Sequence, residues 1–153
     1  MSDIDRQAAQ VQAADPRAEM ARIAAAASGL TYDPLPGDVV RLAKLCLLDW
    51  FGVAIAASRD PIIDTLAAMS APGLPGTTVL ARQERCSLPD ALLINGTAGH
   101  LLDYDDVHTC IPGHVTVAIA PSVVAVGEAL GASGAQMLAA FVAGFEAMCG
   151  IAQ

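Results

Sequence analysis

The chain has 153 residues, enough for one domain or for a part of a larger protein. Apolar residues make up 54% of it and charged residues only 16%, so we expect much of its surface to be covered by further chain or by a partner subunit. The net charge of −8 argues against nucleic acid as a partner, because phosphate backbones are bound by Lys and Arg.

The beginning of the chain and its cysteines indicate a cytoplasmic location. Acidic residues stand where a secretory signal carries basic ones, and no apolar segment follows them. The four cysteines form no CxxC pair, which favours reduced thiols over a disulfide framework. The apolar stretches at 115–127 and 137–145 fall short of the roughly 20 residues that span a bilayer, so we expect buried helices and no membrane partner.

In chain order, the sequence predicts a leader followed by helices. Residues 1–16 lack an apolar period and end in a proline, which predicts a disordered leader. Apolar residues at helical spacing, with Pro, Asp or Ser at several starts, predict six helices at about 17–28, 36–57, 62–70, 87–103, 114–130 and 134–153. Residues 72–76 suit a Pro/Gly turn, and 77–81 are the only strand candidate. The predicted fold class is therefore all-α, a bundle-like arrangement with at most one short strand.

The C-terminal half differs from the rest in charge and in how it ends. All eight Lys and Arg residues precede position 86, whereas 86–153 carry six acids and no Lys or Arg. The last predicted helix reaches Gln153 without Gly, Pro or a basic last turn. We therefore expect 17–153 to be a partial helical domain, truncated at its C-terminal end.

Most of the titratable groups of this half gather in one segment. It holds all three histidines and three acids, namely His100, Asp103, Asp105, Asp106, His108 and His114. His100 and Asp103 are three residues apart, so on a helix they share a face and could hydrogen-bond. Asp106 is then left for a local cap or turn. A solvated helix end and a buried core histidine are the plainer interpretations of the same residues.

Metal and nucleotide sites are weaker alternatives. Two histidines and the acids could ligate a divalent ion, but HxH, HExxH and CxxC motifs are absent and the histidines fall on different predicted units. We therefore expect neither a metal nor a cofactor. The sequence also contains no Walker loop, GxGxxG or Gly-x-Ser-x-Gly elbow.

The same segment resembles the MmgE/PrpD family. Members carry Asn-Gly, then His-x-x-Asp-(Phe/Tyr)-Asp-Asp and then Gly-His-Pro-Ser; the corresponding residues here are Asn95-Gly96, His100-Leu-Leu-Asp103-Tyr-Asp105-Asp106 and Gly113-His114-Val115-Thr116. Leu47-Leu-Asp-Trp-Phe-Gly52 is similar to a Leu-Leu-Asp-x-x-Gly helix of the family, and the likeness extends over about 17–153. Two positions depart from the pattern, with Val115 in place of Pro and Val107 where Thr or Ser is frequent.

The resemblance implies a lyase-type enzyme for small di- or tricarboxylic acids, similar to 2-methylcitrate dehydratase and independent of cofactors. It implies Asp103 and His114 as catalytic residues, His108 and Thr116 as substrate-binding residues, and a homodimer. Substrate carboxylates need cations, which residues 86–153 do not supply beyond histidine. The alternatives are an inactive helical dimerisation module, or a decarboxylase, isomerase or epimerase of the same family.

Overall fold

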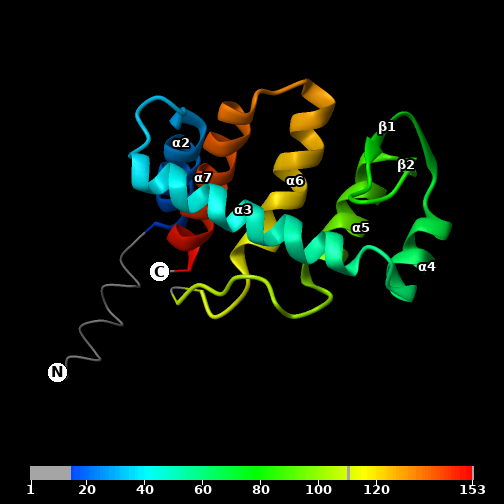
Figure 1. Ribbon diagram of the computed structural model, residues 1–153. Helices are drawn as coiled ribbons and strands as arrows, with labels where there is room; N and C mark the ends of the chain where they lie inside the picture. Colours follow the sequence, from blue (N-terminus) through cyan, green and yellow to red (C-terminus); the bar gives the residue numbers. More distant parts are fainter. Residues whose placement is uncertain (1–14, 110, 153) are drawn as a thin grey trace.

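The computed structural model describes residues 15–109 and 111–152, without the side chains of Pro16 and of 73–75. Six helices and a small two-stranded sheet make up this part of the chain (Figure 1). In chain order they are α2 (Pro16–Gly29), α3 (Gly37–Ala57), α4 (Pro61–Met69), β1 (Pro72–Thr78), β2 (Arg85–Cys86), α5 (Leu88–His100), α6 (Val115–Leu130) and α7 (Gly134–Ile151). The predicted mainly helical class is confirmed.

Helix starts follow the residues that the sequence offers as caps. Asp15 and Asp60 accept backbone N–H groups at the starts of α2 and α4, where proline occupies the first turn of each helix. Ser133 and Gln136 form a complete capping box at α7. Of the predicted leader, 1–14 lie outside the described residues, and Asp15 and Pro16 belong to the start of α2.

The strand begins and ends earlier than its predicted range of 77–81. β1 pairs antiparallel with β2, Thr77 opposite Cys86 and Thr78 opposite Arg85, with an irregular register before Thr77. The chain turns after Thr78, since the Arg82 N–H donates to the Val79 carbonyl at 3.2 Å and Ala81 has a φ of 56°. The two-residue β2 has no apolar period, so the pattern of the sequence did not indicate it.

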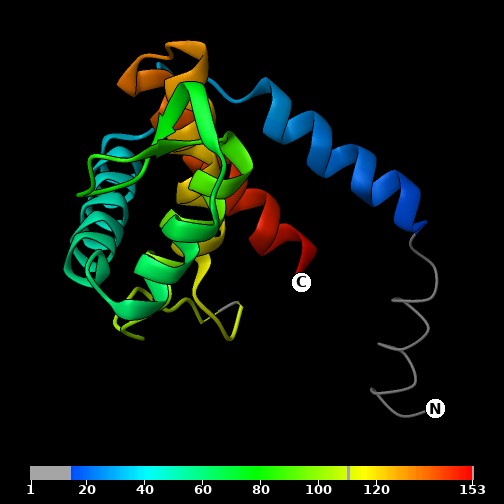
Figure 2. The ribbon, with the colours of Figure 1, turned by 90° about the vertical axis from the view of Figure 1, so that its right-hand side faces the viewer.

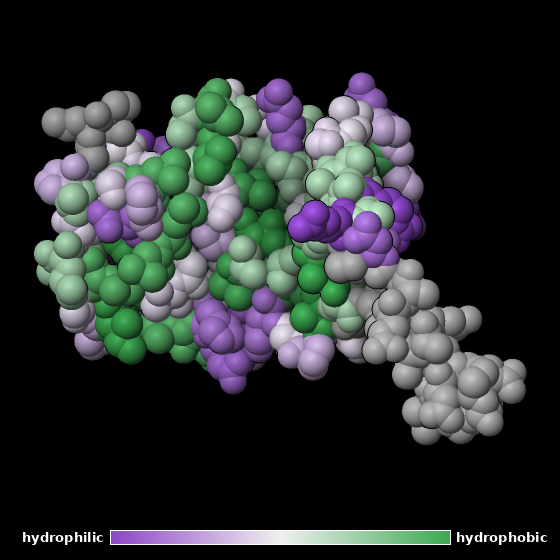
Figure 3. Space-filling model, turned by 180° about the vertical axis from the view of Figure 1, so that it is seen from behind, coloured by the Kyte–Doolittle hydropathy of each residue, from purple (hydrophilic) through white to green (hydrophobic). Residues whose placement is uncertain are grey.

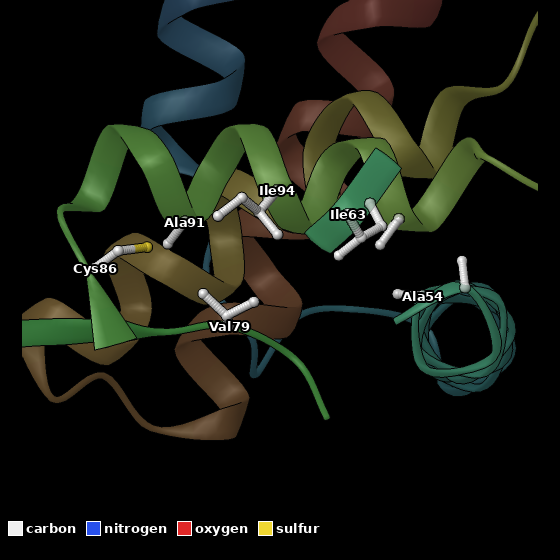
Figure 4. Packing of buried hydrophobic residues seen from close by; sticks show 8 residues of the cluster. Ala54, Ile63, Val79, Cys86, Ala91 and Ile94 are labelled. Atoms are coloured by element: carbon white, nitrogen blue, oxygen red, sulfur yellow. The ribbon is translucent and has the colours of Figure 1, made fainter. Parts of the chain in front are cut away.

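Two apolar clusters share α3 as a common wall. The first joins the C-terminal half of α3 to α4, the sheet and α5, through Ala54, Ile63, Val79, Cys86, Ala91 and Ile94 (Figure 4). The second joins α3, at Ala43 and Trp50, to α6 and α7, and its largest fully buried side chains are Trp50 and Phe141. Burial of these side chains along one face of α3 fixes the position of α5 relative to α6, the two helices that flank the histidine-rich segment.

Buried Asn95 anchors the sheet region on α5. Its carbonyl oxygen accepts the Leu80 N–H at 2.9 Å, and its amide donates to the Thr78 carbonyl at 2.9 Å. Glu128 of α6 binds the same strand, because its carboxylate accepts hydrogen bonds from the Thr78 N–H at 2.9 Å and from the Thr78 hydroxyl at 2.7 Å. These polar side chains tie the strand to two helices.

The outer helices are less covered than the sequence led us to expect. α2 lies at the edge of the molecule and makes its main contacts with α7 (Figure 2). α6 buries seven residues, but α7 buries only Ala139, Phe141 and Val142. By length and composition alone, α7 is the one helix of the described residues that could cross a membrane, which is weak evidence. Apolar residues also reach the surface on the face opposite to that of Figure 1 (Figure 3).

Candidate active site

The histidine-rich segment forms the connection between α5 and α6. α5 ends at His100, three residues before its predicted end, and Leu101 is its C-cap. The Asp103 N–H then donates to the His100 carbonyl at 2.9 Å, and Asp103 takes the left-handed conformation with a φ of 51°. An aspartate tolerates this conformation better than most residues. The connection lies at one end of the helices, below α3 in the view of Figure 1.

A buried carboxylate, Asp105, lies at the centre of the site. Its side chain is fully buried, and it meets two imidazoles. Nδ1 of His100 is 3.0 Å from Asp105 Oδ1 and 3.2 Å from Oδ2. Nδ1 of His114 is 3.2 Å from Asp105 Oδ1 and 3.1 Å from the Asp105 carbonyl oxygen. Helix α5 and the residue preceding α6 therefore deliver two histidines to one carboxylate.

The other nitrogen of His114 faces Asp103. Nε2 of His114 is 3.5 Å from Asp103 Oδ1, and the Asp103 side chain is 82% exposed, so this pair is open to solvent. The rings of His100 and His114 meet edge to face at a centroid distance of 4.6 Å. The structure thus brings together both residues predicted as catalytic, Asp103 and His114.

The predicted contact between His100 and Asp103 side chains is replaced by the contact between His100 and Asp105. Because α5 ends at His100, Asp103 lies beyond the helix and does not share its face. The interpretation of His100 as a plain core histidine is also wrong, since half of its side chain is exposed. No pattern in the sequence singled out Asp105 from its neighbours; the signal for it was only the run of three acids after a helix.

Asp106 caps helix α6, as predicted for a local role. It accepts the Thr116 N–H at 3.3 Å and the Thr116 hydroxyl at 2.5 Å, within the first turn of α6, where the N-cap residue His114 makes no side-chain cap of its own. Thr116 is fully buried. Its hydroxyl donates to Asp106 in the interior of the protein.

Cys46 of α3 lies next to this cap. Burial, followed by the negative charge of Asp106, raises the pKa of the Cys46 thiol. A thiol with a raised pKa stays protonated near neutral pH and is a poor nucleophile. Cys46, Cys86 and Cys149 are free thiols in this structure, and Cys110 lies outside the described residues.

His108 occupies a different place from the other two histidines. Its ring packs edge to face against Phe145 of α7 at a centroid distance of 5.2 Å, and its Nδ1 is 3.9 Å from Cys149 Sγ. It lines a mainly apolar groove of about 380 Å³ between α3 and α7, to which Asp106 and Val107 also contribute. The side chains of the predicted substrate-binding residues thus have partners of their own: His108 contacts Phe145 and Cys149, and Thr116 contacts Asp106.

The cluster offers two kinds of chemistry. An imidazole beside a carboxylate can accept a proton from a substrate and donate one to it. Three atoms of His100, Asp105 and His114 also lie within 4.8 Å of one another, a spacing that could hold a divalent metal ion. The ion pairs of the cluster join histidines and aspartates only, without a Lys or Arg from the described part of the chain.

The family model described as the MmgE/PrpD N-terminal domain matches residues 21–153, which include the whole cluster and all elements from α3 to α7. A search of curated proteins finds no match.

Proposed function

The chain belongs to the MmgE/PrpD family, and from this premise we propose that it is the acid/base half of a lyase-type active site for small di- or tricarboxylic acids. The proposed reaction needs no cofactor. The reaction that we consider most similar is the dehydration of 2-methylcitrate. Decarboxylation or epimerisation of a related acid also requires that a proton is moved at a carbon next to a carboxylate.

The observation that supports the proposal is the pairing of Asp103 with His114. The two side chains come from opposite ends of the connection, yet His114 Nε2 is 3.5 Å from Asp103 Oδ1. Asp103 is exposed, so a substrate can reach the pair from solvent. A proton-transfer group must lie within hydrogen-bonding reach of the proton it moves, and two adjacent groups allow one to take a proton while the other holds the substrate.

In a dehydration, a C–H bond and a C–O bond break. The electron pair of the C–H bond forms the new double bond, the proton passes to a base, and the departing hydroxyl receives a proton and leaves as water. We assign Asp103 as the acid/base group, and His114 as the group that shuttles the proton or binds a substrate carboxylate.

Recognition of the remaining carboxylates needs cations that the cluster lacks. Carboxylates are held in proteins mainly by Arg and Lys. Residues 86–153 contain neither. We propose that another part of the protein or a partner subunit provides them, and that the substrate is bound between the two surfaces.

The same premise supports proposals on assembly and location. We propose a cytoplasmic homodimer, because acidic surface and free thiols suit the cytoplasm and outward-facing Leu42, Leu45 and Leu48 of α3 give a second copy an apolar face to cover. Sedimentation equilibrium of the purified protein measures the dimer directly.

Turnover of a panel of acids tests the proposed function. 2-Methylcitrate, cis-aconitate and iminodisuccinate are offered to the full-length protein and to its Asp103→Asn and His114→Gln variants. We expect one acid to be converted, and each variant to lower kcat/KM by at least about 100-fold, the usual contribution of a general acid or base. The matched control is Asp33→Asn, which changes an exposed aspartate outside the cluster.

Two results would count against the proposal. If both variants keep kcat/KM within a few-fold of the unmodified protein, Asp103 and His114 are not the acid/base pair. If the full-length protein converts none of these acids, the inactive dimerisation module becomes the better account of the fold.

A further inference from the structure

We infer that Asp105 is a positioning residue, which keeps the proton of both His100 and His114 on Nδ1 and thereby leaves Nε2 of His114 as the proton-exchanging atom that faces Asp103. The inference rests on the proposed function in one respect, namely that proton exchange at His114 serves catalysis. The protonation pattern itself follows from the geometry of the cluster.

The first step concerns what Nδ1 of each histidine meets. An ionised carboxylate and a backbone carbonyl can only accept hydrogen bonds. Nδ1 of His100 meets both oxygens of Asp105, at 3.0 and 3.2 Å. Nδ1 of His114 meets one of these oxygens at 3.2 Å and the Asp105 carbonyl at 3.1 Å. Each Nδ1 must therefore be the donor, and it must carry hydrogen.

The second step concerns burial. The Asp105 side chain is fully buried, so water does not compete for its oxygens, and a buried carboxylate is stable only when its hydrogen bonds are made. The histidines are the side-chain partners that the described part of the chain gives it. Asp105 therefore fixes the orientation of both imidazole rings. In return, the two Nδ1–H groups donate the hydrogen bonds that its buried carboxylate requires.

The third step concerns the second ring nitrogen of His114, Nε2. In a neutral imidazole, hydrogen on Nδ1 leaves Nε2 with a lone pair. Nε2 of His114 faces the exposed Asp103 at 3.5 Å. During turnover Asp103 takes the proton of the substrate C–H bond, the electron pair stays with the substrate, and the proton that is passed on to His114 adds at Nε2. The resulting imidazolium lies between Asp105 and Asp103. Both carboxylates stabilise that charge.

Nitrogen NMR of this chain measures the inferred state directly. With ¹⁵N-labelled histidine, at a pH at which the imidazoles are neutral, protonated and unprotonated ring nitrogens give separate signals. We expect the Nδ1 signals of His100 and His114 to be of the protonated type and their Nε2 signals to be of the unprotonated type. If the unmodified chain shows hydrogen on Nε2 of both residues, the inference is wrong.

A nearly isosteric variant tests the role of Asp105. In Asp105→Asn, one acceptor oxygen becomes an amide donor, so we expect His100, whose Nδ1 contacts both oxygens, to lose most of its Nδ1-protonated form. Asp105→Ala removes both side-chain acceptors and should act at least as strongly. The matched control is Asp106→Asn, whose carboxylate contacts Thr116, and it should leave both histidine signals as they are.

The remaining outcomes are equally decisive. Unchanged histidine signals in Asp105→Asn overturn the inference, and so does tight binding of one equivalent of Zn²⁺ with shifts of both Nδ1 signals, because the cluster is then a metal site. The readout is independent of turnover. If the signals are as expected but Asp103→Asn and His114→Gln keep full activity, the proposed function fails while the assigned protonation state stands.

Discussion

At the scale of single residues, the site depends on a glycine that precedes its first histidine. Gly99 of α5 lies against the indole of Trp50, and a Cβ at this position would overlap the indole nitrogen. Trp50 is fully buried and belongs to the cluster that joins α3 to α6 and α7. The close approach of α5 to α3 at this point sets where His100 emerges from the helix.

Gly99→Ala should therefore destabilise the protein, although alanine is the better helix former. Inserting a methyl group into a packed site costs about 1–3 kcal/mol. The matched control on the same helix is Gly96→Ala, whose Cβ would lie at an ordinary 3.6 Å from Pro121 Cγ; it should stabilise by about 0.5–1 kcal/mol. Urea unfolding of both variants measures the difference, and equal stabilities would show that Trp50 does not restrict position 99.

At the scale of elements, the sequence predicted the helices well because their signals are local. Asp15, Asp60 and Ser133 are caps that act within three residues, and Gly131 ends α6 with a φ of 62° in the left-handed conformation that favours glycine. The sheet was predicted less well, since β2 exists only through its pairing with β1. Such pairing depends on contacts between residues far apart in the chain, which a local pattern does not record.

The cap of α7 gives a prediction at this scale. Ser133 accepts the Gln136 N–H, and the Gln136 side chain accepts the Ser133 N–H at 2.8 Å. Ser133→Ala removes half of this reciprocal pair and should cost about 1 kcal/mol. The control is Ser28→Ala at the C-terminal end of α2, where the hydroxyl only donates to the Ala25 carbonyl and the side chain is exposed. Thermal unfolding followed by circular dichroism compares the two; an unchanged Tm for Ser133→Ala would contradict the expected contribution of the cap.

At the scale of the whole molecule, Glu128 links the sheet to the helices. Burial acts to raise the pKa of Glu128, but hydrogen bonds from Thr78 and the neighbouring Arg85 guanidinium outweigh it, and the pKa is lowered from the ordinary value of 4.5. A carboxyl whose pKa is lower in the folded protein adds stability above its ordinary pKa. That contribution is lost as the pH falls through the lower value of the folded state.

Glu128→Gln should therefore lower Tm at neutral pH and reduce the fall of Tm on acidification below about pH 4.5. The amide keeps one acceptor oxygen but loses the charge that pairs with Arg85 at 2.7 Å. Tm measured across this pH range checks the expectation. Parallel curves for the variant and the unmodified protein would show that Glu128 does not contribute through its charge. The exposed Glu146→Gln serves as a control for Tm at neutral pH.

The sequence predicted which residues form the site, but not how their side chains are arranged. The clustering of histidines and acids indicated Asp103 and His114, and the structure brings them together. The sequence could not indicate that Asp105 is the buried centre, because three aspartates within four residues have the same local pattern. Which of them points into the protein depends on where α5 ends and α6 begins. For the same reason His108, close in sequence, lies against α7 instead.

The central claim is that Asp103 and His114 move a proton at a carbon next to a carboxylate. Incorporation of solvent deuterium into that carbon, in the full-length protein supplied with the acid it accepts, measures this step whether water, CO₂ or only the proton leaves. We expect exchange by the unmodified protein and by Asp33→Asn, and a loss of at least about 100-fold in Asp103→Asn and His114→Gln. Exchange by both site variants at the rate of the unmodified protein would contradict the account.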